Sequence, residues 1–194
     1  MKFVIFDTEY TTWKNAQENR WLGEGEFKEI IQIGALLVDF PRLTVLDELI
    51  LTIRPKINPV LSEYCKRLLG VSQEEIDNGI TFQEALQHFL DFCGQHLVVS
   101  YGNDLGVIAE NLILTKSDPL NLYGKNSPSF VNIRYWIFSF DHELKGVVSG
   151  KLWEKVSSVA CKKFVREHNS ISDCYSILQM LRYLQKKHYN LPFS

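Results

Sequence analysis

The chain has 194 residues, of which 45% are hydrophobic, and its formal net charge at pH 7 is −2. A chain of this length can bury a substantial core in one domain, because domains usually contain about 100–200 residues. The charge argues against broad electrostatic wrapping of duplex nucleic acid, which requires many lysine and arginine contacts to phosphates. It does not exclude a small site that holds a few terminal nucleotides through metal ions.

The sequence carries no sign of secretion or of a membrane span. No apolar run approaches the roughly 20 residues that a membrane-spanning helix requires, and the N-terminus turns acidic before an apolar segment long enough for secretion. The cysteines contain no C-x-x-C pair and are Cys65, Cys93, Cys161 and Cys174. We therefore expect a cytoplasmic protein with reduced thiols and no membrane role.

Apolar, β-branched segments predict the strands of a sheet. The expected strands are 2–6, 30–40, 44–53, 96–102 and 131–138. The connection over 10–29 is polar but contains Trp13 and Trp21, two tryptophans that could serve as exposed contact residues.

Two S/T-x-x-E capping boxes follow the third strand, Ser72 to Glu75 and Thr81 to Glu84. In such a box each side chain satisfies a backbone donor at the helix start, so both predict short helices.

Two longer helices are predicted in the second half of the chain. One opens at Asn103 or Asp104, and the last runs over 171–187 with Ser170 as its N-cap. Residues 115–130 lack periodicity and form a loop. Strands that alternate with helices indicate an α/β fold.

The first strand leads into two carboxylates, Asp7 and Glu9. Residues two apart in a strand face the same side, so both project in line with Phe3 and Ile5. Neighbouring carboxylates in a partly desolvated place repel one another and, unless protonated, require a cation, for which oxygen ligands favour Mg²⁺ or Mn²⁺. The alternative, and the commoner arrangement for an isolated D-x-E, is a solvated turn beyond the strand.

Asp104 and Asp173 lie on helix faces that should turn inward, since apolar residues follow each at helical spacing. Each also has a structural alternative. Asp104 could cap its helix, and Asp173 could be the acidic member of a capping box after Ser170. His168 lies in a polar loop where its ring can stay accessible, although a lone loop histidine is usually a surface residue.

Three motifs together resemble those of the DEDDh, or DnaQ-like, 3'→5' exonucleases: FDTEY (6–10), YGNDLGVIAENL (101–112) and HNSISD (168–173). EIIQIGALLVD (29–39) is also similar, and TIRPKINPVLSEYCKRLLGVSQEEID (52–77) resembles the Eri-type exoribonuclease branch. The likeness runs from residue 3 to about residue 183, with a poor match over 115–165.

The resemblance implies an α/β, RNase H-like fold, with a central mixed five-stranded sheet flanked by α-helices, as a single exonuclease domain over residues 1–194. It implies a metal-dependent enzyme that hydrolyses single-stranded RNA or DNA from the 3' end to nucleoside 5'-monophosphates. Two Mg²⁺ or Mn²⁺ ions would be held by Asp7, Glu9, Asp104 and Asp173. An imidazole with a pKa near 6.5 can accept a proton from water, so His168 is the candidate general base.

The resemblance further assigns contact with the terminal nucleotide to Thr8, Tyr10, Leu69 and Asn103, with Leu69 as an apolar wedge. The competing class is a catalytically weak nucleic-acid-binding module of the same fold, in which aromatic side chains such as Tyr101 stack on bases. An endonuclease of related fold is a second alternative. The choice between RNA and DNA and the oligomeric state stay open.

Overall fold

The computed structural model describes residues 1–118, 122, 127–134, 136, 169–188 and 190–191. A five-stranded sheet forms its centre, in the order β3-β2-β1-β4-β5. The strands are β1 (Lys2–Tyr10), β2 (Ile30–Asp39), β3 (Thr44–Thr52), β4 (Leu97–Ser100) and β5 (Phe130–Asn132). β2 pairs antiparallel with both β1 and β3, whereas β4 pairs parallel with both β1 and β5. The sheet is therefore mixed, as predicted, with β1 in the middle.

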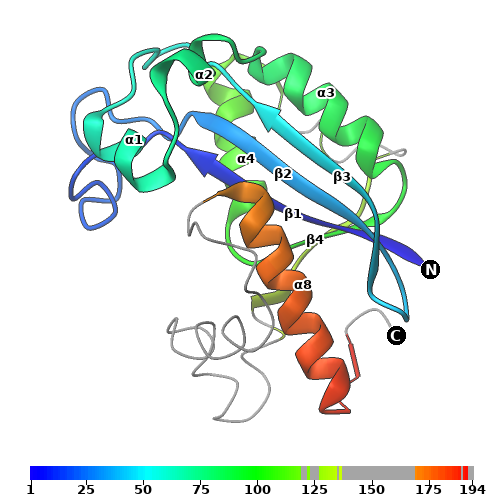
Figure 1. Cartoon of the computed structure of the whole chain (residues 1–194). Coiled ribbons are helices and arrows are strands. Elements are labelled where there is room, and N and C mark those ends of the chain that lie inside the picture. The colour runs from blue at the N-terminus through cyan, green and yellow to red at the C-terminus, as the bar shows by residue number, and fades with distance from the viewer. Residues whose placement is uncertain (119–121, 123–126, 135, 137–168, 189, 192–194) are drawn as a thin grey trace.

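Helices cover both faces of this sheet. The described helices are α1 (Glu63–Leu69), α2 (Gln73–Asp77), α3 (Phe82–Cys93), α4 (Asp104–Leu114) and α8 (Ser170–Lys186). Figure 1 shows α8 lying across one face, while α3 and α4 lie behind the other. None of the helices in the described ranges combines the length and the apolarity needed to span a bilayer.

The central strand packs on both of its faces because its apolar side chains alternate. Phe3 and Ile5 belong to the core cluster that includes the buried side of α8. Val4 and Phe6 belong to the cluster formed with α3 and α4. Full burial of a side chain of this size contributes about 1.5–3 kcal/mol, so the packing on two faces fixes the path of β1 as far as Phe6.

The first strand is longer than predicted, and this settles the position of its two acids. β2 pairs with β1 beyond residue 6, with Asp7 opposite Gly34 and Glu9 opposite Gln32. Both carboxylates therefore lie within the strand, and the solvated-turn alternative is wrong. The local sequence underestimated the strand because the ladder to β2, and not residue propensity, determines where it ends.

The fifth strand is shorter than the predicted 131–138 and ends at Asn132, and residues 133 and 134 are helical. The Asn132 side chain donates to the carbonyl of Gly102 and accepts a hydrogen bond of 3.0 Å from the Arg134 N–H. Such side-chain bonds to the backbone compete with a sheet ladder. They divert the chain despite its β-branched composition.

Both capping boxes are confirmed at the starts of α2 and α3. The helix α1 was not predicted, although Ser62 caps its N-terminus and Gly70, at φ 64°, ends it. The last helix begins one residue earlier than expected, so its N-cap is Asn169, which accepts from the Ser172 N–H, and not Ser170. Cys65, Cys93 and Cys174 are free and buried, and Cys161 lies outside the described residues.

Candidate active site

Four carboxylates from three elements meet at the end of β1. Asp7 and Glu9 come from β1 and Asp173 from α8, and one ligand oxygen of each lies within 4.8 Å of those of the other two. Asp104, from α4, lines the same cavity of about 270 Å³. The remaining lining residues are Thr8, Tyr10, Lys28, Tyr101, Gly102, Asn103 and Val107.

A glycine in β2 allows α8 to reach the two acids of β1. Gly34 pairs with Asp7, and a Cβ at this position would lie 2.5 Å from the Ile171 nitrogen and 2.6 Å from the Ser170 carbonyl carbon. Any larger residue would collide with the backbone of the first turn of α8. The missing side chain therefore sets the close approach that brings Asp173 beside Asp7.

Asp173 is the fourth residue of α8 and does not act as a cap. Asn169 caps the helix, and a capping box would place its acid at the third helical residue, which is Ser172. The predicted capping-box alternative for Asp173 is therefore wrong. Its carboxyl instead forms a side-chain hydrogen bond with Glu9, and it lies near the helix N-terminus, where the helix dipole favours negative charge.

The side chain of Asp104 is tied to the central strand. Its carboxylate accepts hydrogen bonds from the Thr8 N–H at 3.2 Å and the Thr8 hydroxyl at 2.9 Å. The N-cap of α4 is Asn103, so the capping alternative for Asp104 is also wrong. Two donors from one residue fix this carboxylate against β1.

The clustered acids hold their protons more tightly than isolated acids do. Burial, and then the charges of Asp104, Asp173 and Glu9, raise the pKa of Asp7 well above its usual range. Burial, followed by the charges of Asp173 and Asp104, raises the pKa of Glu9 to about 8. Burial also raises the pKa of Asp104, although the hydrogen bonds from Thr8 oppose this.

The donor set fits a divalent ion. Ionisation of the cluster at neutral pH requires a cation that offsets desolvation and mutual repulsion. Carboxylate oxygens are the ligands that Mg²⁺ and Mn²⁺ prefer. The residues that would hold such ions are the four acids expected from the sequence.

The structure brings most of the other predicted site residues to this cavity. Thr8, Tyr10 and Asn103 line it, although the Thr8 hydroxyl is already engaged by Asp104. Leu69 does not line the cavity: it is 3% exposed and packs in a separate core cluster beneath α1. Leu69 lies on the inner face of α1, and the sequence did not show this because α1 was not predicted. His168 lies outside the described residues.

The loop before β2 contributes residues that the sequence did not place. Trp21 is partly buried and meets the Tyr10 ring edge to face, with the centroids 5.6 Å apart, and its Nε1 donates to the Thr11 carbonyl at 3.2 Å. Trp13 is also partly buried, so both tryptophans are less exposed than the sequence led us to expect. Lys28 was missed as a lining residue, because its place just before a strand carries no signal of a site.

A mixed five-stranded sheet with a carboxylate cluster on its central strand is the arrangement of RNase H-like exonucleases. The family model for exonucleases of the RNase_T type matches residues 4–181. The chain belongs to this exonuclease family.

Individual relatives support the same placement. The 3'-5' exonuclease eri1 of Schizosaccharomyces pombe is 30% identical over 95 residues, which are 48% of this chain and 32% of that protein. The probable 3'-5' exonuclease KapD of Bacillus subtilis is 23% identical over 190 residues, or 94% of this chain and 84% of KapD. The chain thus matches about a third of the length of eri1 but most of KapD.

Two solved structures share the fold. The nuclease domain of 3'hExo, a DEDDh family member bound to rAMP, superposes with a TM-score of 0.72 at 22% identity, over 95% of this chain and 92% of that domain. Exonuclease I of E. coli in complex with a dT13 oligonucleotide gives a TM-score of 0.67 at 11% identity, over 96% of this chain and 41% of that one. The RNase H-like architecture predicted from the sequence is confirmed.

Proposed function

We propose that this chain is a 3'→5' exonuclease that hydrolyses single-stranded RNA or DNA to nucleoside 5'-monophosphates. The observation that carries the proposal is the convergence of Asp7, Glu9, Asp104 and Asp173 on one cavity. Membership of the exonuclease family supports the reaction type. The direction is supported by the names of the relatives, eri1 and KapD, as 3'-5' exonucleases.

The chain's own residues suit a reaction in which metal ions supply the electrophilic chemistry. Asp7 would hold two Mg²⁺ or Mn²⁺ ions, with Glu9 and Asp173 completing one site and Asp104 the other. When bound, such a pair activates water and stabilises the leaving 3' oxygen. Thr8 holds the Asp104 carboxylate in place through its two hydrogen bonds.

Other residues of the chain would bind the terminal nucleotide and accept the proton of the attacking water. Tyr10 and Asn103 line the cavity and would bind the terminal nucleotide. His168 would take the proton of the attacking water, as the HNSISD motif implies. Its ordinary pKa, near 6.5, allows this at neutral pH. The cytoplasmic location and the single domain over 1–194 stay predictions from the sequence.

The test uses a 5'-labelled oligonucleotide, in matched RNA and DNA forms, with Mg²⁺ or Mn²⁺. A ladder that shortens from the 3' end, lost on chelation and in the Asp7→Asn variant, is the expected result. Internal cuts would instead indicate an endonuclease. Retention of the oligonucleotide without any product would indicate a binding module.

A further inference from the structure

Lys28 brings a positive charge to the carboxylate cavity. Its side chain lines the same cavity as the four acids and is the only lysine or arginine among the described residues that do so. The Nζ atom lies 4.5 Å from the centroid of the Trp21 ring and 5.7 Å from that of Tyr10. The lysine is thus held by two aromatic faces, a favourable arrangement for a cation.

The backbone around Lys28 is fixed by buried side chains. The Asn111 amide, 3% exposed, donates to the Lys28 carbonyl at 2.7 Å and accepts from the Ile30 N–H at 2.9 Å. The Glu29 carboxylate accepts from the three successive backbone N–H groups of residues 56–58, at 2.6–2.7 Å. These anchors, at the Lys28 carbonyl and at the two residues that follow, leave little freedom in where the lysine side chain starts.

Among the residues that the structure describes, no carboxylate forms an ion pair with the Lys28 ammonium. Two divalent ions would neutralise the four carboxylates of the cavity, which would leave the single negative charge of a bound phosphodiester unmatched. One lysine supplies one compensating charge in a partly desolvated site, where such a contact is stronger than in water.

We propose that Lys28 binds the scissile phosphate of the substrate, which the released nucleotide keeps as its 5'-phosphate. This inference rests on the proposed exonuclease function. Trp21 and Tyr10 act as positioning residues that hold the ammonium at the cavity before substrate enters. A cavity of about 270 Å³ that contains both the acids and the lysine places any bound nucleotide phosphate close to both.

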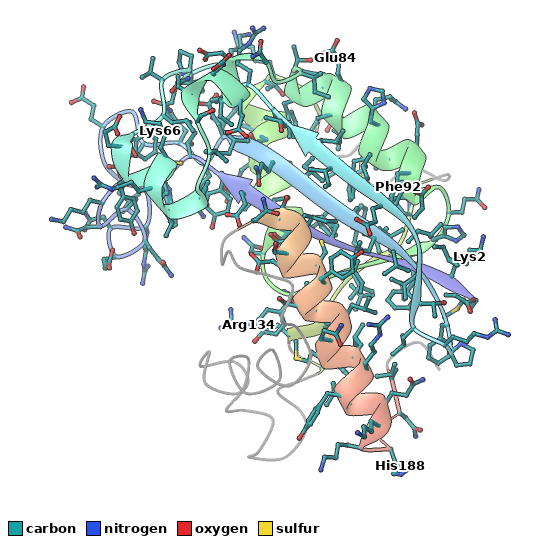
Figure 2. All side chains as sticks on the ribbon, in the orientation of Figure 1. Lys2, Lys66, Glu84, Phe92, Arg134 and His188 are labelled. Atoms are coloured by element: carbon teal, nitrogen blue, oxygen red, sulfur yellow. The ribbon has the colours of Figure 1, made fainter. Side chains whose placement is uncertain are left out.

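The test compares charge-changing variants at Lys28. Lys28→Met removes the charge but keeps a flexible apolar side chain to cover Trp21, whereas Lys28→Arg keeps the charge. Lys2→Met is the matched control, because it removes a lysine at the other end of the sheet. Figure 2 shows Lys2 opposite to Lys66 of α1, the helix that contacts Tyr10. Thermal melting verifies that each variant is folded. Lys28→Gln is a second neutral variant, to be used if Lys28→Met does not fold.

The probes are adenosine 5'-monophosphate and adenosine, used as inhibitors of oligonucleotide hydrolysis in Mg²⁺. Lys28→Met should weaken inhibition by the monophosphate about 10–100-fold, the usual effect of losing a charge-assisted hydrogen bond, and leave inhibition by adenosine unchanged. kcat/KM should fall by a similar factor. The inhibition constants and kcat/KM of Lys28→Arg should stay within a few-fold of the wild-type values, and those of Lys2→Met should equal the wild-type values.

Other outcomes would overturn the inference. An equal loss of both inhibitors would assign Lys28 to the shape of the cavity and not to the phosphate. A change in the Mg²⁺ concentration required for activity, with an unchanged ratio of the two inhibition constants, would assign it to neutralisation of the acids. A wild-type protein that yields no ladder would refute the proposed function itself, whereas an active wild type with an indistinguishable Lys28→Met would refute only the role of Lys28.

Discussion

Replacing Glu9 by glutamine removes a carboxylate whose ionisation destabilises the metal-free folded protein. Burial and the charges of Asp173 and Asp104 raise the pKa of Glu9 from 4.5 to about 8. The folded chain therefore keeps a proton that the unfolded chain releases, and the stability of the metal-free protein falls as the pH rises from about 4.5 to about 8. Glutamine does not titrate, so the variant escapes this penalty.

The size of the effect follows from the pKa difference. One pKa unit corresponds to about 1.4 kcal/mol, so at pH 7 the penalty on the free energy of unfolding is about 3 kcal/mol, and at pH 5 it is below about 1 kcal/mol. For a protein of this length the larger value corresponds to a rise in Tm on the order of 10 °C. Glu9→Gln should therefore be the more stable protein without metal, by a margin that grows from pH 5 to pH 8.

Divalent ions should reverse this order. Wild type gains stability from metal binding in proportion to its affinity, whereas Glu9→Gln has lost a ligand and gains less. The assay is thermal or urea unfolding at pH 5, 7 and 8, with EDTA and with Mg²⁺ or Mn²⁺. Glu18→Gln, at an exposed position in the loop before β2, is the matched control. A Glu9→Gln variant no more stable than wild type in EDTA at pH 8 would show that burial and the neighbouring charges do not raise the pKa of Glu9 as described.

Four substitutions test the rest of the site. Asp7→Ala should abolish hydrolysis while the chain stays folded, so wild-type-like rates in either metal would refute the metal assignment. Gly34→Ala places a Cβ 2.5 Å from the Ile171 nitrogen and should cost about 1–3 kcal/mol in urea unfolding. Its loss of activity, measured well below its Tm, should exceed the fraction unfolded because Asp173 moves. Thr8→Val removes the 2.9 Å hydrogen bond to Asp104 and should lower kcat/KM by about 10-fold or more, with a larger requirement for metal. His168→Ala should lower kcat about 10²–10⁴-fold and remove the acid limb of the pH profile near pH 6.5, with metal affinity unchanged; a retained rate and limb would make His168 a surface residue.

Much of the local structure could be predicted from the sequence because it depends on neighbours. Two-residue alternation placed Asp7 and Glu9 on the face of Phe3 and Ile5, and the structure confirms this. Both capping boxes formed as their spacing required. Such features involve contacts over two to four residues, which the chain makes in any fold that contains the element.

The recognition of the family needed more than any local pattern. Asp104 and Asp173 each had a capping alternative that residue spacing alone did not exclude. Only the order of three motifs, and the family resemblance that it carries, united them with Asp7 and Glu9. The structure then gave the physical reason: the Thr8 hydrogen bonds hold Asp104, and α8 packs directly on Gly34.

Thr8, Tyr10 and Asn103 line the cavity as expected, but only the tertiary structure decided the places of Leu69 and Lys28. Leu69 was expected there and is buried elsewhere, whereas Lys28 was not expected and lines the cavity. Asn111, 83 residues away along the chain, fixes the Lys28 carbonyl. Contacts over such separations depend on how helices pack on the sheet, and no periodicity within a segment encodes them. The sequence therefore determined the acids and the strand that presents them, and packing determined the surroundings in which those acids would bind metal and substrate.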